Sequence, residues 1–113
     1  MLTIGEFSRL GRVSPRMLRH YDALGLLCPE TVGENSYRYY RQEQLERLLQ
    51  IRRLQDYGFP LAQVGRLLGL SDEELLPHLH RRRLDAHYEV YRMQERLREM
   101  EEDILRMEGR PMP

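Results

Sequence analysis

The chain has 113 residues, of which 41% are hydrophobic and 32% charged, and its formal net charge is zero. This length suits one domain, and the large share of charge favours a helical protein with long solvated faces over a compact sandwich. The single cysteine, Cys28, excludes an internal disulfide and a multi-cysteine zinc site. The apolar runs are too short for a membrane span, and no signal segment is evident, so we expect a cytoplasmic protein.

A short helix is predicted near the N-terminus. Thr3 and Glu6 form a capping box, in which a hydroxyl and a carboxylate each satisfy an otherwise unpaired backbone N–H. Apolar residues follow at helical spacing over residues 4–10, and Gly11 is expected to end the helix.

A second short helix is predicted after a tight turn. Ser14 supplies its N-cap, Pro15 its first-turn proline, and Gly25 closes it. The residues expected on its buried side are Met17, Leu18, Tyr21 and Leu24. Two short helices joined by a turn that contains glycine indicate a helix-turn-helix.

Residues 26–41 predict a β-hairpin, or wing, between helical segments. Residues 26–29 form a short extended run, and residues 37–41 are rich in strand formers. Between them, residues 33–36 have the composition of a turn.

Two more helices are predicted, over residues 42–57 and from Pro60 to Gly69, with Gly58 in the break between them. The residues expected to face inward are Leu45, Leu48, Leu49, Leu54, Leu61, Val64, Leu67 and Leu68. Arg47 and Arg53 are expected to lie largely outside.

The last segment is the most periodic. Ser71 and Glu74 form a second capping box, and Pro77 precedes a helix-forming stretch that reaches Glu108. Apolar residues recur there in alternating steps of four and three, which is the pattern of a coiled coil. We therefore predict a homodimer interface made of Leu79, Ala86, Val90, Met93, Leu97, Met100, Ile104 and Met107. The alternative is that this stripe packs on the chain's own domain.

Charge is divided unevenly along the chain. Residues 1–66 hold ten arginines against seven acidic residues, and residues 67–113 hold eight arginines against eleven. Within the basic part, Arg16, Arg19 and His20 share one face of the second helix. A recognition helix in a DNA major groove needs such a cationic face opposite an apolar one. The alternative is a solvated surface.

The segment Tyr37-Arg38-Tyr39-Tyr40-Arg41 is a second candidate for DNA contact. Alternation along a strand places Arg38 and Tyr40 on one side and the other three residues on the opposite side. Tyrosine hydroxyls and arginines commonly donate to phosphates. The alternative is an edge strand that only packs.

The remaining reactive side chains predict no metal site, cofactor or enzyme. Cys28 is expected to be a small packed hydrophobe. His78, His80 and His87 lack the spacing that lets two imidazoles bind one ion, and the run 81–83 of three arginines is expected to be solvated. No nucleophile lies in sequence near a base and an orienting group, and no glycine-rich phosphate loop occurs.

The chain resembles MerR-family transcription regulators over essentially its whole length. The motifs that carry the resemblance, in the family's order and spacing, are Thr3-Ile4-Gly5-Glu6-Phe7, Leu18-Arg19-His20-Tyr21-Asp22, Gly25-Leu26-Leu27, Tyr37-Arg38-Tyr39-Tyr40 and Tyr57-Gly58-Phe59-Pro60-Leu61. The resemblance implies a mainly α fold, a winged helix-turn-helix with a small β-hairpin wing and a long C-terminal helix that dimerises as an antiparallel coiled coil. At position 36, where many members have glycine, this chain has serine, and in this it resembles the drug-responsive subgroup.

The resemblance also implies the partners and the site. The expected partners are double-stranded promoter DNA, a second copy of the chain, and RNA polymerase indirectly through DNA that the dimer bends and untwists. The residues expected to contact DNA are Ser14, Arg16, Arg19, His20, Tyr21, Arg38, Tyr39 and Tyr40. Metal-sensing relatives carry cysteines at the end of the dimer helix or after it, where this sequence has none.

We expect three regions: a DNA-binding domain over 1–70, a dimerisation helix over 71–108, and a tail or linker over 109–113. Six residues after Met107 cannot enclose a ligand, so we expect a fragment of a longer regulator rather than a naturally short one. The rival functions are a coiled-coil adaptor whose head binds protein, and a DNA-binding chain that senses through its coiled coil. The operator, the inducer and the sign of regulation are not readable from the sequence.

Overall fold

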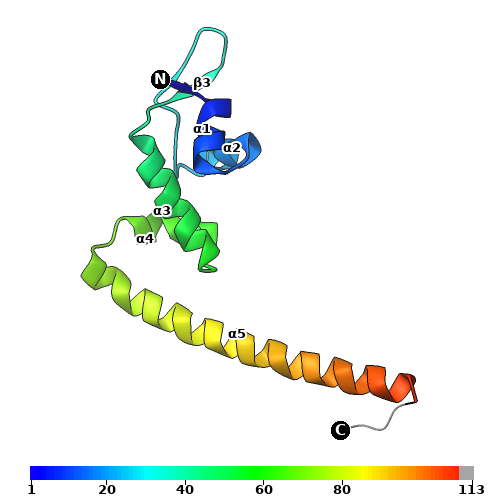
Figure 1. Cartoon of the computed structure of the whole chain (residues 1–113). Coiled ribbons are helices and arrows are strands. Elements are labelled where there is room, and N and C mark those ends of the chain that lie inside the picture. The colour runs from blue at the N-terminus through cyan, green and yellow to red at the C-terminus, as the bar shows by residue number, and fades with distance from the viewer. Residues whose placement is uncertain (110–113) are drawn as a thin grey trace. The chain divides into compact units, whose positions relative to one another are not determined.

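The computed structural model describes residues 1–109, and the chain divides into two compact units, Met1–Leu70 and a second that begins at Ser71 (Figure 1). The fold is mainly α, with a small antiparallel sheet and a long C-terminal helix, as predicted. The predicted tail over 109–113 lies, apart from Gly109, outside the described residues. No helix among the described residues is long and apolar enough to cross a membrane.

The helix-turn-helix consists of α1 (Ile4–Gly11) and α2 (Pro15–Ala23). The capping box of α1 is confirmed, since the Thr3 N–H donates to Glu6 Oε1 at 3.0 Å and the Glu6 N–H to Thr3 Oγ1 at 3.2 Å. The hydroxyl of Ser14 caps α2 by accepting from the Met17 N–H at 3.0 Å. Gly11 is still helical, and Arg12 takes the left-handed conformation that ends α1.

The sheet has three strands, β1 (Leu2–Thr3), β2 (Thr31–Val32) and β3 (Arg38–Tyr40). Their order is β1-β3-β2, and both pairs are antiparallel, with Leu2 opposite Tyr40 and Thr31 opposite Tyr39. The wing is therefore confirmed, and β1 adds a strand that the sequence did not predict.

The first arm of the wing lies later in the sequence than predicted. The run 26–29 is not a strand, because the N–H groups of Leu26 and Leu27 both donate to the carbonyl of Tyr21, at 2.9 and 3.4 Å, and so continue the end of α2. At the tip of the wing, Ser36 has a φ of 65°, in the left-handed region that favours glycine.

The core of the first unit lies among its four helices and the sheet. It includes α3 (Gln44–Asp56) and α4 (Leu61–Leu68), both close to their predicted limits. The buried hydrophobic residues are Phe7, Leu18, Tyr21, Leu26, Leu27, Tyr40, Leu48, Ile51, Leu54, Phe59, Val64 and Leu67. Two leucines predicted to face inward are exposed, Leu24 at 49% and Leu49 at 47%, while Ile51 is buried instead.

The end of α1 packs closely against α3. A Cβ added at Gly11 would lie 2.1 Å from Cδ2 of Leu48, which is itself fully buried. Arg52 of α3 also donates to the carbonyl of Gly11 at 2.6 Å. Gly11 therefore permits this approach of the two helices, in addition to lying near the turn.

The second unit is one helix, α5 (Asp72–Met107). Its capping box between Ser71 and Glu74 is confirmed, with N···O distances of 3.1 Å in both directions. Pro77 lies inside α5, in its second turn. None of the residues of α5 is buried within the chain.

We predict that Gly11→Ala destabilises the first unit by about 1–3 kcal/mol, because the added methyl overpacks against Leu48. Gly5→Ala is the matched control on the same helix, since its nearest neighbour would be Thr3 Oγ1 at 3.9 Å. We expect the control to be neutral or to stabilise by up to about 1 kcal/mol. Urea unfolding followed by circular dichroism measures both, and equal midpoints for the two variants would contradict the close approach.

Candidate nucleic-acid interface

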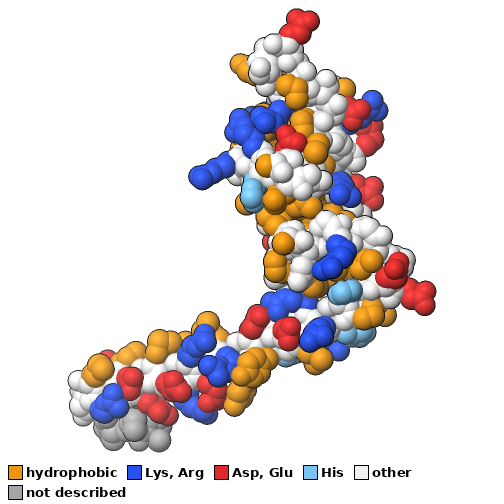
Figure 2. Space-filling model, turned by 180° about the vertical axis from the view of Figure 1, so that it is seen from behind, with side chains coloured by type: hydrophobic (Ala, Val, Ile, Leu, Met, Phe, Trp, Pro, Cys, Tyr) orange, Lys and Arg blue, Asp and Glu red, His pale blue; other side chains and the backbone are white. Residues whose placement is uncertain are grey.

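The outer face of α2 carries the cations that the sequence placed there. Arg16, Arg19 and His20 are exposed, whereas Leu18 and Tyr21 on the other side of the helix have exposed fractions of 0% and 1%. Arginine side chains of the first unit are exposed in groups on its surface (Figure 2). The helical spacing divides α2 into a cationic and an apolar side, and burial of the apolar side leaves the cationic side at the surface.

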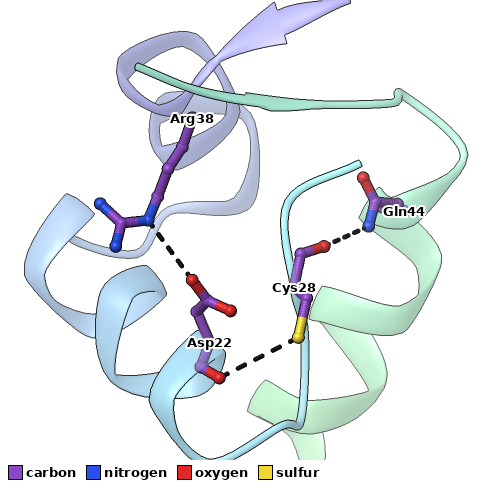
Figure 3. A network of polar contacts seen from close by, with 4 residues as sticks. All are labelled: Asp22, Cys28, Arg38 and Gln44. Carbon is purple, nitrogen blue, oxygen red and sulfur yellow. Dashed lines mark hydrogen bonds and ion pairs between the residues drawn. The ribbon is translucent and has the colours of Figure 1, made fainter. Parts of the chain in front are cut away.

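The wing approaches α2 through an ion pair that joins β3 to the last turn of the helix. Nε of Arg38 lies 3.4 Å from Oδ2 of Asp22, and both side chains are about one third exposed or less, at 34% and 27% (Figure 3). The pair uses only one edge of the guanidinium toward Asp22. Its remaining N–H groups stay available for an acceptor such as a phosphate.

A hollow on the surface lies between α2 and the wing, and it brings Arg19 and Arg38 together. Its lining residues are Thr3, Ile4, Arg19, Ser36, Tyr37 and Arg38. Tyr39, the neighbour of Arg38 on β3, is half-buried. The structure therefore places an arginine of the helix and an arginine of the wing on one concave surface, although 19 positions separate them in sequence.

Two tyrosines predicted to contact DNA belong to the core instead. The Tyr21 hydroxyl donates to Oε1 of Gln55 on α3, and burial raises its pKa. Tyr40 is fully buried and stacks on Phe7, with ring centroids 4.5 Å apart and an angle of 2° between the planes. Both rings hold helices and sheet together, so they have no surface to offer a duplex, and the prediction is wrong for these two side chains.

The buried phenol of Tyr40 lies near two charged side chains, Asp22 and Arg38. Burial is the main cause that raises its pKa, and the carboxylate of Asp22 adds to this effect. Its hydroxyl is buried with no hydrogen-bond partner among the described residues. Asp22 therefore acts on both Arg38 and Tyr40 of the wing strand.

Cys28 is exposed and is not the packed hydrophobe that the sequence predicted. Its thiol donates to the carbonyl of Asp22 at 4.0 Å, and its own carbonyl accepts from Nε2 of Gln44 at 2.7 Å (Figure 3). The hydrogen bond to Asp22, followed by partial burial, raises the pKa of the thiol. A raised pKa leaves the thiol protonated at neutral pH, which makes it a poor nucleophile and metal ligand.

The other candidate metal ligands do not assemble either. No group of three or more His, Cys, Asp or Glu side chains in residues 1–109 is arranged to hold a metal ion.

In the arginine run of α5, Arg81 and Arg83 are exposed, while Arg82 is half-buried and makes two hydrogen bonds to Glu89, at 2.9 and 3.1 Å.

The predicted dimer seam forms an apolar stripe along α5. Val90, Met93, Leu97, Met100 and Ile104 are between 47% and 56% exposed, and Met107 is 78% exposed. Leu79 and Ala86 are half-buried. Hydrophobic side chains recur on the surface of α5 among the charged ones (Figure 2).

Comparison with known proteins identifies the family. The model of the MerR HTH family regulatory protein matches residues 2–70. Transcriptional regulator BrlR of Pseudomonas aeruginosa is 43% identical over 86 residues, which cover 73% of this chain and 32% of BrlR. The multidrug-efflux transporter 2 regulator of Bacillus subtilis is 41% identical over 75 residues, covering 66% of this chain and 28% of that protein. The chain thus spans about a third of the length of these relatives.

Solved structures agree with the sequence matches. A MerR-family transcriptional regulator from Bacillus cereus has a TM-score of 0.83 at 30% identity, covering 97% of this chain and 86% of that one. EcmrR, solved by cryo-electron microscopy in complex with DNA, has a TM-score of 0.82 at 30% identity, covering 95% of this chain and 40% of EcmrR. The chain belongs to the MerR family of helix-turn-helix regulatory proteins.

Proposed function

We propose that the chain binds double-stranded promoter DNA as a homodimer and regulates transcription by distorting the duplex. The observation that carries the proposal is the hollow between α2 and the wing, which Arg19 and Arg38 both line. The similar structure of EcmrR is of a complex with DNA, which supports a duplex as the ligand. The proposed DNA-contacting residues are Ser14, Arg16, Arg19, His20, Arg38 and Tyr39.

Within this set, the helix and the wing have different roles. The exposed face of α2 enters the major groove, where arginine pairs with guanine edges or clamps a phosphate. Arg38, oriented by Asp22, contacts the sugar-phosphate backbone beside the groove. Ser14, at the N-terminus of α2, is close to the backbone N–H groups that the helix presents to phosphate.

The effect on RNA polymerase is indirect in this proposal. A promoter whose recognition elements are one base pair too far apart presents them rotated by about 34°, since a helical turn holds roughly 10.5 base pairs. A dimer that bends and untwists the centre restores their alignment at an elastic cost on the order of a few kcal/mol. Contacts to phosphates from both subunits offset this cost.

The proposal includes no catalysis, cofactor or metal, since the site offers cations to a polyanion and no activated nucleophile. The proposed function also requires the cytoplasmic location that we expect from the sequence, because a promoter-binding protein must be in the same compartment as DNA. Two copies are needed because the apolar stripe of α5 is about half exposed in one copy.

We predict that Arg38→Ala removes one phosphate contact in each subunit. The slope of log affinity against log salt concentration should fall by about 0.9 per contact, or about 1.8 for a symmetric dimer, on promoter and random duplex alike. Fluorescence anisotropy between low and moderate salt measures the slope. Arg92→Ala on α5, outside the proposed face, is the control, and an unchanged slope for Arg38→Ala would refute the role of the wing.

We predict that Arg19→Ala costs roughly 1–3 kcal/mol per half-site and relaxes sequence preference, if this arginine reads a base edge. Binding to a panel of operator variants measures the preference, with random duplex as the reference. Uniform weakening on every sequence would reassign Arg19 to a phosphate, and no weakening at all would refute its place in the interface.

We predict that Asp22→Asn weakens binding to promoter and to random duplex alike, severalfold, because Arg38 loses the ion pair that orients it toward a phosphate. In an Arg38→Ala background, the same change should have little further effect, since coupled residues are non-additive. The cycle of four proteins is measured by anisotropy, after circular dichroism has shown that each is folded. Additive effects of the two substitutions would contradict this positioning role.

We predict that Leu97→Glu dissociates the homodimer, because it places two charges in an apolar interface at a cost of several kcal/mol. Leu84→Glu is the matched control, since Leu84 is 64% exposed on the same helix and lies outside the seam. Sedimentation velocity at micromolar concentration reads the state of each. A monomeric parent chain would overturn the dimer outright, and loss of dimer in both variants would move the interface off the seam.

A further inference from the structure

The hydroxyl of Tyr40 is buried without a hydrogen bond. In the part of the chain that the structure describes, it is the one buried side-chain oxygen or nitrogen with no hydrogen-bond partner. A buried donor without a partner lowers the stability of a fold, because its hydrogen bonds to water are lost. Phenylalanine at this position would keep the stacking on Phe7 and avoid that cost. The stability of the free chain therefore gives no reason for a hydroxyl here.

Tyr40 lies beside the ion pair that joins the wing to α2. Residues two apart on a strand point to the same side, so Tyr40 and Arg38 share one side of β3. That side faces the helices, because Tyr40 stacks on Phe7 of α1 and Arg38 pairs with Asp22 of α2. The Asp22 carboxylate is also close enough to the phenol to help raise its pKa. Tyr40, Arg38 and Asp22 thus form one group.

Asp22 can accept a second hydrogen bond within this group. Nε of Arg38 lies 3.4 Å from Oδ2 of Asp22 (Figure 3), and a carboxylate can accept at both of its oxygens. Oδ1 is therefore a suitable acceptor for a hydroxyl on the same side of β3. The two further groups that affect the pKa of the phenol are Cys28 and Arg19. The thiol of Cys28 donates to the backbone carbonyl of Asp22, and Arg19 lines the hollow between α2 and the wing.

We infer that Tyr40 is a positioning residue for DNA binding: in the complex its hydroxyl donates to Oδ1 of Asp22, while Arg38 keeps its contact with Oδ2 and turns its free edge to a phosphate. The inference rests on the proposed function and adds a residue that acts through Asp22 without touching DNA. Asp22 is then held from two sides, by the phenol and by the guanidinium.

The phosphate is the reason why this hydrogen bond forms in the complex. A phosphate at Arg38 is a second anion on the same guanidinium, so it weakens the hold of Arg38 on Asp22. The side chain of Asp22 is only 27% exposed, so water compensates this loss incompletely. A hydroxyl is a neutral donor, and it stabilises the carboxylate without competing with the phosphate for the cation. The hydroxyl thus has a cost in the free chain and a benefit in the complex.

Removing the hydroxyl separates these two effects. In Tyr40→Phe, the midpoint of urea unfolding should stay the same or rise. The affinity for a random-sequence duplex at low salt should fall severalfold, though by no more than in Asp22→Ala, through which the hydroxyl acts. Tyr21→Phe is the matched control for stability, since its hydroxyl has a partner in Gln55 and its midpoint should fall. Tyr88→Phe, which removes an exposed phenol hydroxyl on α5, is the control for affinity and should leave it unchanged.

Two results of this comparison would overturn the inference. An unchanged affinity for Tyr40→Phe would show that the hydroxyl has no part in DNA binding. A lower urea midpoint for Tyr40→Phe would show that the hydroxyl is already hydrogen-bonded in the free chain, to water or to a protein group.

Carbon-13 NMR measures the hydrogen bond itself. Tyrosine labelled at Cζ reports the hydrogen bonding of each phenol, and the Tyr40 signal is assigned by its loss in Tyr40→Phe. We expect this signal to shift when the random duplex is added, and to shift much less in Asp22→Ala and in Arg38→Ala, which lack the acceptor and the phosphate ligand. A Tyr40 signal that does not move while the parent chain binds the duplex would overturn the inference alone. A parent chain that binds no duplex would overturn the proposed function as well.

Discussion

The burial of one side of α2 is the constraint on which the candidate interface depends. Leu18 and Tyr21 lie in the core, and the hydrogen bond from Tyr21 to Gln55 ties the helix to α3. A helix anchored in this way cannot rotate, so Arg16 and Arg19 stay on its outer face. The energy of hydrophobic burial, exerted on apolar residues, thus determines where the cations are presented.

The wing is held in place by two further contacts of different kinds. The stacking of Tyr40 on Phe7 ties β3 to α1 through an apolar surface, and the ion pair between Arg38 and Asp22 ties it to α2. The stacked pair is buried and stabilises the fold, whereas the ion pair is partly solvated and mainly orients the side chain of Arg38. A wing arginine held in this way is preorganised, which lowers the entropy lost on binding.

The two units of the chain differ in whether their apolar residues are buried within one copy. The first buries a core within one copy, while α5 buries none of its residues. In the proposed homodimer, a second copy would cover the half-exposed apolar seam of α5, and the stability of this unit would then depend on the concentration of the protein. The same chain thus combines a unit that folds around its own core with a helix that has no core of its own.

The sequence alone determined the features that depend on neighbours along the chain: both capping boxes, the cationic face of α2, the wing and the periodic C-terminal helix. It erred where packing decides, since Tyr21 and Tyr40 are core residues and Leu24 and Leu49 are exposed. It also could not show that Asp22 reaches Arg38 or that Leu48 needs a glycine at position 11, because these contacts join residues 16 and 37 positions apart. Local patterns determine helix ends and helix faces, because they act through hydrogen bonds between residues a few positions apart. Only the tertiary structure decides which residues of a face pack against another element and become buried.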